Sequence, residues 1–503
     1  MASQQIVQDP VRSKPDLKSF GKDVTKLVSG TVVAQIVLLL SYPVLTRLYD
    51  PEAMGVFSLF VSIVSIIATI SCLRYNYAIL IPENEKEAQN IFATCLGILS
   101  CICFISLVVL WICQNTIVNI LDAPSLYNYI LYIPLLVFIE GLFIILRYWN
   151  SRKKQFGSQA VAKTTQSVSI VGGQLGFGVA GAATSVSLII AEILGRSVGV
   201  LLLLYNFIRT DLSQFRTSLQ RRLMKDLLVR YKKFVLIDPW SALVNSISWQ
   251  LPVLLLAGYF SPVIAGFYAL GFKAFQMPMS LIGSSIEQVF FQRAAILKRE
   301  GGLNILLEDV VKIFLMFTSI PIILLTVTGG DIFAVVFGEI WREAGVYTQI
   351  LALWAFVWVI ASPLNTLLQV LELHSIGFIM LFMNLITRAA SLMIGGYYND
   401  IYLALILFAI SGILVYGSLI YIYFRKTHAS VKSVLHSTRF SVIYAICSLG
   451  VLWALKQLYI ISSMGMLILT AGCLIVYYLL LFRICPSAKE YLTIFLPFNL
   501  KRG

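Results

Sequence analysis

Charged residues are scarce in this sequence. Only 12% of its 503 residues are Asp, Glu, Lys or Arg, whereas 59% are hydrophobic and the mean hydropathy is +0.86. Soluble domains of this composition would expose too much hydrocarbon to water, so that class of protein is excluded. The apolar residues recur in stretches of about 20, the length that a helix needs to cross roughly 30 Å of bilayer. The sequence therefore predicts an all-α polytopic membrane protein.

Residues typical of catalytic and metal sites are also few. Histidine occurs three times, no P-loop is present, and the eight cysteines form no CxxC pair. The histidines (His374, His428 and His436) fall at predicted cytoplasmic edges, where we expect solvated surface residues. The cysteines lie in or near apolar spans, which favours small packing residues over disulfides or metal ligands. We therefore expect no enzyme activity, no metal site and no bound cofactor.

The apolar stretches predict about fourteen transmembrane helices. Their expected ranges are 24–46, 54–81, 91–113, 128–149, 165–183, 184–206, 235–258, 264–291, 311–329, 347–371, 375–396, 401–424, 440–460 and 464–482. We divide the chain into a cytoplasmic N-terminal segment (1–23), an N-lobe of spans 1–6 (24–206), a basic cytoplasmic connector (207–234), a C-lobe of spans 7–12 (235–424), and a basic loop with spans 13 and 14 and a cytoplasmic tail (425–503). No apolar segment precedes span 1, so we expect this span to direct insertion.

Lysine and arginine are unevenly distributed between the two sides of the predicted bundle. With the N-terminus in the cytoplasm, and with Lys26, Lys312 and Lys456 near span ends counted with the adjoining segments, 30 of the 38 lie in cytoplasmic segments, three lie outside and five lie within spans. This asymmetry satisfies the positive-inside rule and places both termini in the cytoplasm. Contact with anionic lipid then accounts for the net charge of +14 without a nucleic-acid partner. The basic run RRLMKDLLVRYKK in the connector fits this interpretation, with a regulatory or partner site as the alternative.

A short repeat suggests that the two lobes are related. The segment YDPEAMGVFSL at 49–59 is echoed by FSPVIAGFYAL at 260–270, so that Pro51 matches Pro262 and Gly55 matches Gly266. Each copy follows a basic cluster by about one membrane span. Six spans before and six after the connector are inserted in the same direction, which favours a pseudo-twofold axis normal to the membrane. We expect two six-helix lobes and two C-terminal helices.

Five cations fall within the predicted spans, where each costs about 2.5–3.5 kcal/mol unless a partner, a wet cavity or a function compensates. Arg74, Lys273 and Arg388 have no acidic residue one turn away on their own helices. We predict that these three line a cavity and bind substrate; the alternative is snorkelling to head groups or pairing across helices. Several cations with few uncompensated anions predict an anionic cargo, and arginine suits phosphate oxygens.

The other two intramembrane cations have acidic residues nearby. Glu192 precedes Arg196 by four residues, so a structural ion pair is at least as well favoured as a substrate contact. Arg147 ends span 4 beside two aromatic residues, which is typical of an interface, and Glu140 shares its helical face. Both arginines are candidate substrate ligands. The candidate ion-coupling residues are Glu140, Glu192, Asp238 and Glu287.

Two further patterns near these residues have both a structural and a functional interpretation. Gly172 and Gly176 form a GxxxG, which favours close helix packing; the alternative is a helix that bends during transport. Aromatic and amide side chains near the intramembrane cations are able to stack on or hydrogen-bond sugar rings, although most aromatics must be packing residues. These candidates are Trp149, Trp249, Tyr75, Tyr148 and Asn76.

Several segments resemble a family of polysaccharide exporters. The resemblance lies in GTVVAQIVLLLSYPVLTRLYDPEAMGVFSLF, LRYNYAILIPENEKEAQN, RYWNSRKKQF and ALGFKAFQMPMSLIGSSIEQVFFQRA, and covers at least the first 300 residues. These segments are similar to Wzx-type O-antigen flippases, in the polysaccharide transporter family of the multidrug/oligosaccharidyl-lipid/polysaccharide (MOP) exporter superfamily. Most members are described with twelve spans, whereas the related lipid II flippases have fourteen.

The resemblance implies movement of an undecaprenyl-pyrophosphate-linked oligosaccharide across the bacterial inner membrane. Two MATE-like lobes would alternately open a cationic cleft to each side, driven by a proton or sodium gradient. The implied partners are the lipid-linked glycan, anionic lipids, a glycan polymerase and a chain-length regulator. A MATE-like drug/cation antiporter is the main alternative, although a cationic cargo would favour acidic cavity residues. A polytopic glycan polymerase or ligase is a further alternative, although such enzymes are expected to carry a large outer loop, which the predicted topology does not contain.

Overall fold

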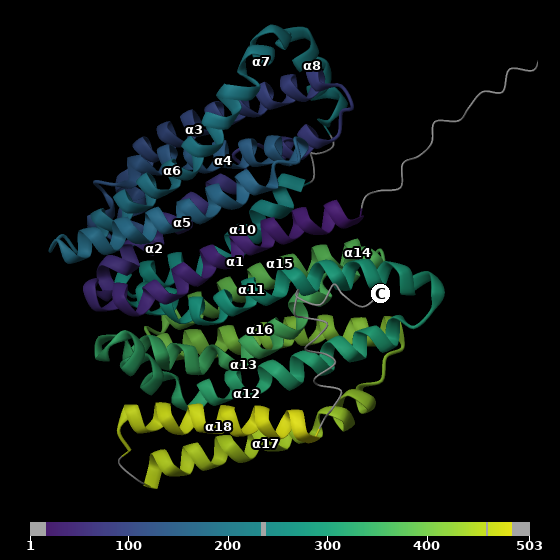
Figure 1. Cartoon of the computed structure of the whole chain (residues 1–503). Coiled ribbons are helices and arrows are strands. Elements are labelled where there is room, and N and C mark those ends of the chain that lie inside the picture. Colours follow the sequence, from purple (N-terminus) through teal and green to yellow (C-terminus); the bar gives the residue numbers. More distant parts are fainter. Residues whose placement is uncertain (1–16, 233–237, 459–460, 485–503) are drawn as a thin grey trace, which may run out of the picture.

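The chain folds into a bundle of long helices that lie side by side. The computed structural model describes residues 17–232, 238–458 and 461–484, and Figure 1 shows their arrangement. Within these ranges fourteen helices have 19 residues or more, and no strand occurs. They are α1 (Leu17–Leu48), α2 (Pro51–Thr69), α3 (Glu85–Ile120), α4 (Ile133–Arg152), α5 (Phe156–Val179), α6 (Ser185–Thr210), α10 (Asp238–Tyr259), α11 (Pro262–Glu300), α12 (Leu303–Phe337), α13 (Arg342–Leu364), α15 (His374–Tyr397), α16 (Ile401–Thr427), α17 (Val431–Leu458) and α18 (Ser463–Ile484). The predicted all-α polytopic fold is confirmed.

Two of the fourteen helices, α5 and α11, are less apolar than most. Among the described residues eleven helices are long and apolar enough to cross a bilayer by composition, and α1 contributes the shorter apolar segment Val32–Leu48, whereas α5 and α11 do not qualify. Helices α5 and α11 contribute polar side chains, among them Lys163 and Lys273, to a cavity inside the bundle. Their lower hydropathy follows from this position, because a helix that lines a wet cavity keeps polar residues on that face.

The helices form two packed groups and a final pair (Figure 1). In the first group α5 packs on α1 and α6, and α4 packs on α3 and α6; in the second, α13 packs on α11, α12 and α16, and α15 packs on α10 and α16. Helix α2 joins the groups through α10 and α11, while α17 and α18, yellow in Figure 1, lie beside α12. This grouping fits two six-helix lobes followed by two helices, and the residues that bound each lobe stay a prediction.

Two short helices, α7 (Leu212–Ser218) and α8 (Arg221–Arg230), lie within the predicted connector. We call the end of the bundle that they cover the connector end, and the other the far end (Figure 1). Parts of the predicted N-terminal segment, connector, seventh span, thirteenth span and tail (1–16, 233–237, 459–460 and 485–503) lie outside the described residues.

Helices α2 and α11 begin in the same way, at the two copies of the sequence repeat. In each, a polar capping residue precedes a proline in the first turn. Asp50 Oδ1 accepts a hydrogen bond from Ala53 N (2.7 Å), and Ser261 Oγ accepts one from Ile264 N (3.4 Å). Proline suits this place because its missing N–H would have no partner within the helix. The repeat is therefore a helix-start signal in both lobes.

The glycines of the repeat bring the two lobes into contact at the far end. A Cβ built on Gly55 would lie 1.8 Å from the carbonyl oxygen of Pro262, and one built on Gly266 would lie 2.3 Å from that of Pro51. A side chain at either position would force the two backbones apart. The contact is reciprocal, as expected of two elements related by a twofold axis. We call this contact the glycine seam.

Two hydrogen bonds at the same end also join helices of different lobes. The indole Nε1 of buried Trp341 donates to Thr46 O (2.7 Å), and Arg47 Nη2 donates to Val335 O (3.3 Å). Together with the glycine seam they hold the lobes against each other at the far end.

The second predicted span is wrong at its C-terminal end. It was expected to run to residue 81, but α2 ends at Thr69 and is followed by turns and a 3-10 helix, Tyr75–Leu80. Leu73 (φ 43°) and Arg74 (φ 60°) both occupy the left-handed region, which a continuous helix does not contain. Hydropathy cannot detect this end because the turn is almost as apolar as the helix. Arg74 therefore lies in a turn and not within a membrane-spanning helix.

The GxxxG of α5 is not a packing motif. A Cβ on Gly172 or Gly176 would meet nothing within 4 Å, whereas one on Gly173 would lie 3.0 Å from Ala191 Cβ of α6. The interpretation of Gly172 and Gly176 as a close helix contact is wrong, because the helix contact is made by the face one residue further along.

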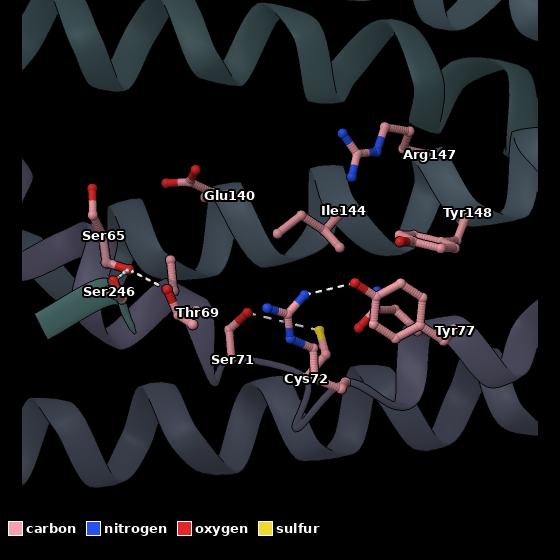
Figure 2. Close-up of a pocket in the computed structure, with 13 residues that line it drawn as sticks. Ser65, Thr69, Ser71, Cys72, Tyr77, Glu140, Ile144, Arg147, Tyr148 and Ser246 are labelled. Atoms are coloured by element: carbon pink, nitrogen blue, oxygen red, sulfur yellow. Dashed lines mark hydrogen bonds between the residues drawn. The ribbon is translucent and has the colours of Figure 1, made fainter. Parts of the chain in front are cut away.

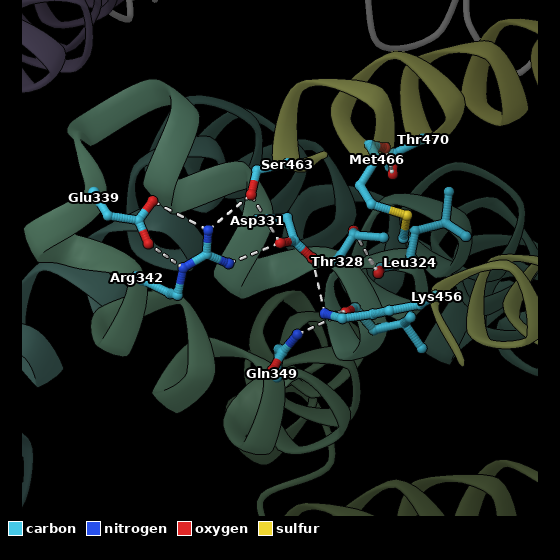
Figure 3. Close-up of polar contacts among 11 residues, drawn as sticks. Leu324, Thr328, Asp331, Glu339, Arg342, Gln349, Lys456, Ser463, Met466 and Thr470 are labelled. Atoms are coloured by element: carbon cyan, nitrogen blue, oxygen red, sulfur yellow. Dashed lines mark hydrogen bonds and ion pairs between the residues drawn. The ribbon is translucent and has the colours of Figure 1, made fainter. Parts of the chain in front are cut away.

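A network of ion pairs fastens the final helix pair to α12 and α13. Asp331 of α12 accepts hydrogen bonds from Arg342 Nη1 (2.7 Å), Lys456 Nζ (2.8 Å) and Ser463 Oγ (3.1 Å), as Figure 3 shows. Glu339 binds the same guanidinium, with 2.5 Å between Nε and Oε1. Arg342 and Lys456 are two of the three cations assigned to the outside by sequence, and both are bound by one nearly buried carboxylate.

Replacing Asp331 with asparagine should loosen the attachment of α17 and α18. The change leaves Arg342 and Lys456 without their common carboxylate, and we expect a loss of about 1–3 kcal/mol in the free energy of unfolding. The measurement is the melting temperature in detergent. Glu339→Gln is the matched control, because it removes a partner of Arg342 that is exposed and should cost about 0.5 kcal/mol or less. Equal losses in the two variants would contradict the special role of Asp331.

Candidate functional site

Two cavities lie one after the other along the bundle. The first, of about 340 Å³, is nearer the connector end and is lined by α2, the turn after it, α4 and Ser246 of α10. The second, of about 440 Å³, extends toward the far end and is lined by α1, α2, α5, α6, α10 and α11. We call them the connector-side cavity and the central cavity.

The connector-side cavity holds two arginines and one carboxylate. Figure 2 shows Glu140 and Arg147, both from α4, on one wall of this cavity, opposite the residues of α2 and its following turn. Arg74 Nη1 donates to Tyr77 Oη (2.7 Å), and Arg147 lies 5.6 Å from the centre of the Tyr148 ring. Within the described part of the chain neither arginine has a carboxylate within 4 Å. Both guanidinium groups therefore keep donors that an anion in the cavity is able to bind.

The walls of the central cavity differ between the lobes. The N-lobe wall is polar and charged, and it includes Gln35, Lys163, Gln166, Gln174, Glu192 and Arg196. The C-lobe wall presents the aromatic residues Trp249, Tyr268 and Phe272, with Lys273, Gln250 and Gln276 beside them. A ligand with an anionic group and a flat apolar face matches this pair of walls.

Arg196 lies where the two cavities approach each other. Its Nη1 is 2.6 Å from Glu140 Oε2, in the connector-side cavity, and its Nε is 2.7 Å from Glu192 Oε1, in the central cavity. The ion pair with Glu192 that the four-residue spacing favoured is confirmed. Glu140 shares a helical face with Arg147 but pairs with Arg196 on α6. The two deepest acidic candidates therefore bind one arginine.

Two lysines supply the remaining charge of the central cavity. Lys273 Nζ donates to Tyr42 Oη across the lobe interface and lies 4.7 Å from the centre of that ring. Lys163 Nζ approaches Gln166 Oε1 (3.5 Å) and lies 5.9 Å from the centre of the Phe143 ring. Neither lysine has a carboxylate within 4 Å among the residues that the structure describes. They are the cations of this cavity that no acidic side chain neutralises.

Arg388 lies behind the aromatic wall, and its residue is 2% exposed. Its Nη1 donates to Ser248 O (3.0 Å) and Ser248 Oγ (3.2 Å), and its Nη2 donates to Tyr416 Oη (3.2 Å). The prediction that Arg74, Lys273 and Arg388 line one cavity is wrong. Arg74 belongs to the connector-side cavity and Lys273 to the central cavity, whereas Arg388 lines neither.

Some of the other predicted site residues line a cavity, and others do not. Asp238, the first residue of α10, and Glu287 of α11 are exposed and line neither cavity, so their role in ion coupling stays a prediction. Trp149 is 1% exposed and donates its Nε1 to Asp211 Oδ2 (3.1 Å), which makes it a residue of the N-lobe core. Trp249, in contrast, lines the central cavity.

Sequence reasoning missed the polar face of α5. Lys163 was assigned to a cytoplasmic segment because the predicted span began at residue 165, whereas α5 begins at Phe156. Lys163, Gln166 and Gln174 recur over three helical turns on one face and line the central cavity. The signal was present as a polar stripe on a mostly apolar segment, and only the assumption of a uniformly apolar span hid it.

Comparisons with known proteins place this arrangement in a family. The profile described as polysaccharide biosynthesis protein matches residues 44–346, and a comparison with curated protein sequences gave no match. The structure is similar to that of the lipid II flippase MurJ in an inward closed conformation, with a TM-score of 0.67 and 12% identity over 93% of this chain and 99% of that chain. It is also similar to an inward-facing multidrug resistance MATE family transporter of the MOP superfamily, with a TM-score of 0.63 and 16% identity over 78% of this chain and 94% of that chain.

The two structural similarities, at identities this low, establish the fold. The family profile covers more than half of the chain, including α2, α4, α5, α6, α10 and α11, which line the cavities together with α1. The resemblance found in the sequence is confirmed: the protein belongs to the polysaccharide biosynthesis protein family and has the fold of the MOP superfamily.

Proposed function

We propose that this protein is a flippase that moves an undecaprenyl-pyrophosphate-linked oligosaccharide across the bacterial inner membrane. The observation that carries the proposal is the central cavity, where Lys163 and Lys273 face one space from opposite lobes. Cations that carboxylates do not neutralise attract a pyrophosphate and form charge-assisted hydrogen bonds with its oxygens. Family membership and the fold shared with MurJ, a lipid II flippase, support a lipid-linked glycan as the cargo.

The proposed route begins at the connector end, the predicted cytoplasmic side. The lobes are in contact at the glycine seam, so the head group first meets Arg74 and Arg147 and then reaches Lys163 and Lys273. The polyprenyl tail stays in the bilayer, because its apolar surface gains nothing from a polar cavity. Rocking of one lobe against the other then separates the seam and exposes the head group to the outer leaflet.

Arg196 provides a route for coupling to an ion gradient. If the pyrophosphate binds this arginine, Glu140 and Glu192 lose their common partner and become sites for a proton or sodium ion. We propose these two carboxylates as the coupling groups. Both termini would be cytoplasmic, the basic connector would contact anionic lipid, and a glycan polymerase and chain-length regulator would use the delivered glycan.

Two alternatives are less well supported by the site. A drug or cation antiporter has a related fold, but both carboxylates that line the cavities are paired with Arg196. A glycan polymerase or ligase needs a reactive centre. The string GRSVG at 195–199 matches a serine-hydrolase pattern, but Ser197 lies inside α6 and donates to Ile193 O (2.7 Å), so it is not on a strand-to-helix turn.

Reconstitution into liposomes tests the proposal. The probe is the lipid-linked oligosaccharide extracted from source cells that lack this protein, and the readout is its exposure to a membrane-impermeant glycosidase. We expect the wild-type protein to accelerate leaflet exchange at least about tenfold, and the double variant Lys163→Gln, Lys273→Gln to lose at least about tenfold, because each lost charge-assisted hydrogen bond is worth about 1.5–3 kcal/mol.

Lys225→Gln, on exposed α8, is the matched control and should transport normally. Absence of exchange by the wild-type protein would refute the flippase. Export of a cationic dye in the same liposomes would support the antiporter, and formation of glycosidic bonds would support the enzyme.

A further inference from the structure

We propose that Trp249 is a stacking platform for a sugar ring of the cargo and that Arg388 is the positioning residue that holds it. This inference rests on the proposed flippase function and adds the glycan part of the binding site. The two residues come from different helices, α10 and α15, and their contact is one of the closest between a cation and a ring in the described protein: Arg388 Cζ lies 4.2 Å from the centre of the Trp249 ring.

Trp249 is a half-buried member of a group of packed rings. Its ring centre lies 5.3 Å from that of Trp358, 5.8 Å from that of Phe272 and 6.5 Å from that of Trp354, which is fully buried. Trp249 and Phe272 line the central cavity, whereas Trp354 and Trp358 do not. A ring supported on several sides keeps its orientation when a ligand arrives, so little conformational entropy is lost on binding.

Arg388 fixes Trp249 from the protein side. Three hydrogen bonds to Ser248 and Tyr416 hold the guanidinium. Ser248 directly precedes Trp249 in the sequence, so the arginine is bound next to the tryptophan that it contacts. No carboxylate lies within 4 Å of Arg388 in the described ranges, and its buried Nε has no hydrogen-bond partner there. Burying a guanidinium without an anion is costly, and a packed apolar residue would serve a purely structural role better. The cost is understandable if the cation orients the indole.

The chemistry of the two walls selects a sugar. A pyranose has an apolar face of C–H groups and a rim of hydroxyl groups. Its apolar face matches the Trp249 ring, and its hydroxyls match the amides of Gln166 and Gln174 on the opposite wall. Lys163 and Lys273 border the same cavity, so the pyrophosphate and the sugar next to it are bound together.

The test separates the sugar from the pyrophosphate. In proteoliposomes we would measure the apparent KM for the extracted lipid-linked oligosaccharide and the Ki of undecaprenyl pyrophosphate without sugar. Trp249→Ala should raise the KM about tenfold, the loss expected for one stacking contact, and leave the Ki unchanged within about twofold. Trp249→Phe should keep most of the affinity. Trp240→Ala, an exposed tryptophan on the same helix, should change neither constant.

A double-mutant cycle tests Arg388 as a positioning residue. Arg388→Gln should raise the KM and leave the Ki unchanged, and it should add nothing further in the Trp249→Ala background. Equal changes of KM and Ki in Trp249→Ala, or additive effects of the two substitutions, would overturn the inference. A wild-type protein that moves no lipid-linked oligosaccharide refutes the proposed function itself, and this result is obtained before any variant is compared.

Discussion

A leucine at Gly55 is expected to abolish transport while the protein stays folded and inserted. The glycine seam leaves no space for a side chain, since even a Cβ would lie 1.8 Å from the backbone of Pro262. Backbone atoms cannot move aside as a flexible side chain does, so closing the seam should cost about 3 kcal/mol or more. The closed population then falls at least about a hundredfold, and transport falls with it because every cycle passes through that state.

The accessibility of the central cavity tests this explanation. Ser62 lines the cavity, and a cysteine at this position in a background without native cysteines reports entry of a membrane-impermeant maleimide from the outer side. Gly55→Leu should make this cysteine react faster than it does in the wild-type background, where the closed seam protects it during part of each cycle. Gly176→Leu is the matched control, because a Cβ there meets nothing within 4 Å, and it should preserve both transport and protection. Protection unchanged by Gly55→Leu would show that the seam is not a gate.

Much of the fold follows from one-dimensional properties of the sequence. Apolar segments of membrane-spanning length predicted the long helices, since the bilayer imposes that length on each one. The repeat around Gly55 and Gly266 was visible because a close contact between lobes permits only glycine there. The end of α2 at Thr69 was not visible, because the turn that follows it is stabilised by packing and not by polar turn residues. Hydropathy reports the solvent around a segment and not its backbone conformation.

The site was predicted less completely than the fold. Intramembrane charge correctly drew attention to Arg196 and Lys273, because charge at that depth needs a partner or a cavity. Charge alone did not distinguish Lys273, which faces the cavity, from Arg388, which lies behind Trp249. That distinction depends on which helix face is turned inward, and it required the packing of α10 and α15. Lys163 was missed because its helix is too polar to be read as a uniformly apolar span.

Arg196→Gln is expected to lower both stability and transport. Glu140 and Glu192 each lie within 2.7 Å of this guanidinium, and the substitution leaves two carboxylates close together without a counter-charge. Breaking a buried ion pair costs about 3–5 kcal/mol, and we expect the lower part of this range because the Glu140 side chain is 30% exposed. The melting temperature in detergent measures this loss. Arg147→Gln is the matched control for stability, because Arg147 has no carboxylate within 4 Å among the described residues.

Removing the carboxylates as well separates the two roles of Arg196. In the triple variant Arg196→Gln, Glu140→Gln, Glu192→Gln no charge is left unpaired, so most of the lost stability should return. Transport of the lipid-linked oligosaccharide should not return, because the variant lacks both the arginine proposed to bind the pyrophosphate and the carboxylates proposed to bind the coupling ion. If transport recovered together with stability, Arg196 would be a structural residue, and the coupling route through Glu140 and Glu192 would be wrong. If neither stability nor transport recovered, the three amides would not pack as well as the ion pairs do. The single variants Glu140→Gln and Glu192→Gln would show which amide causes this loss.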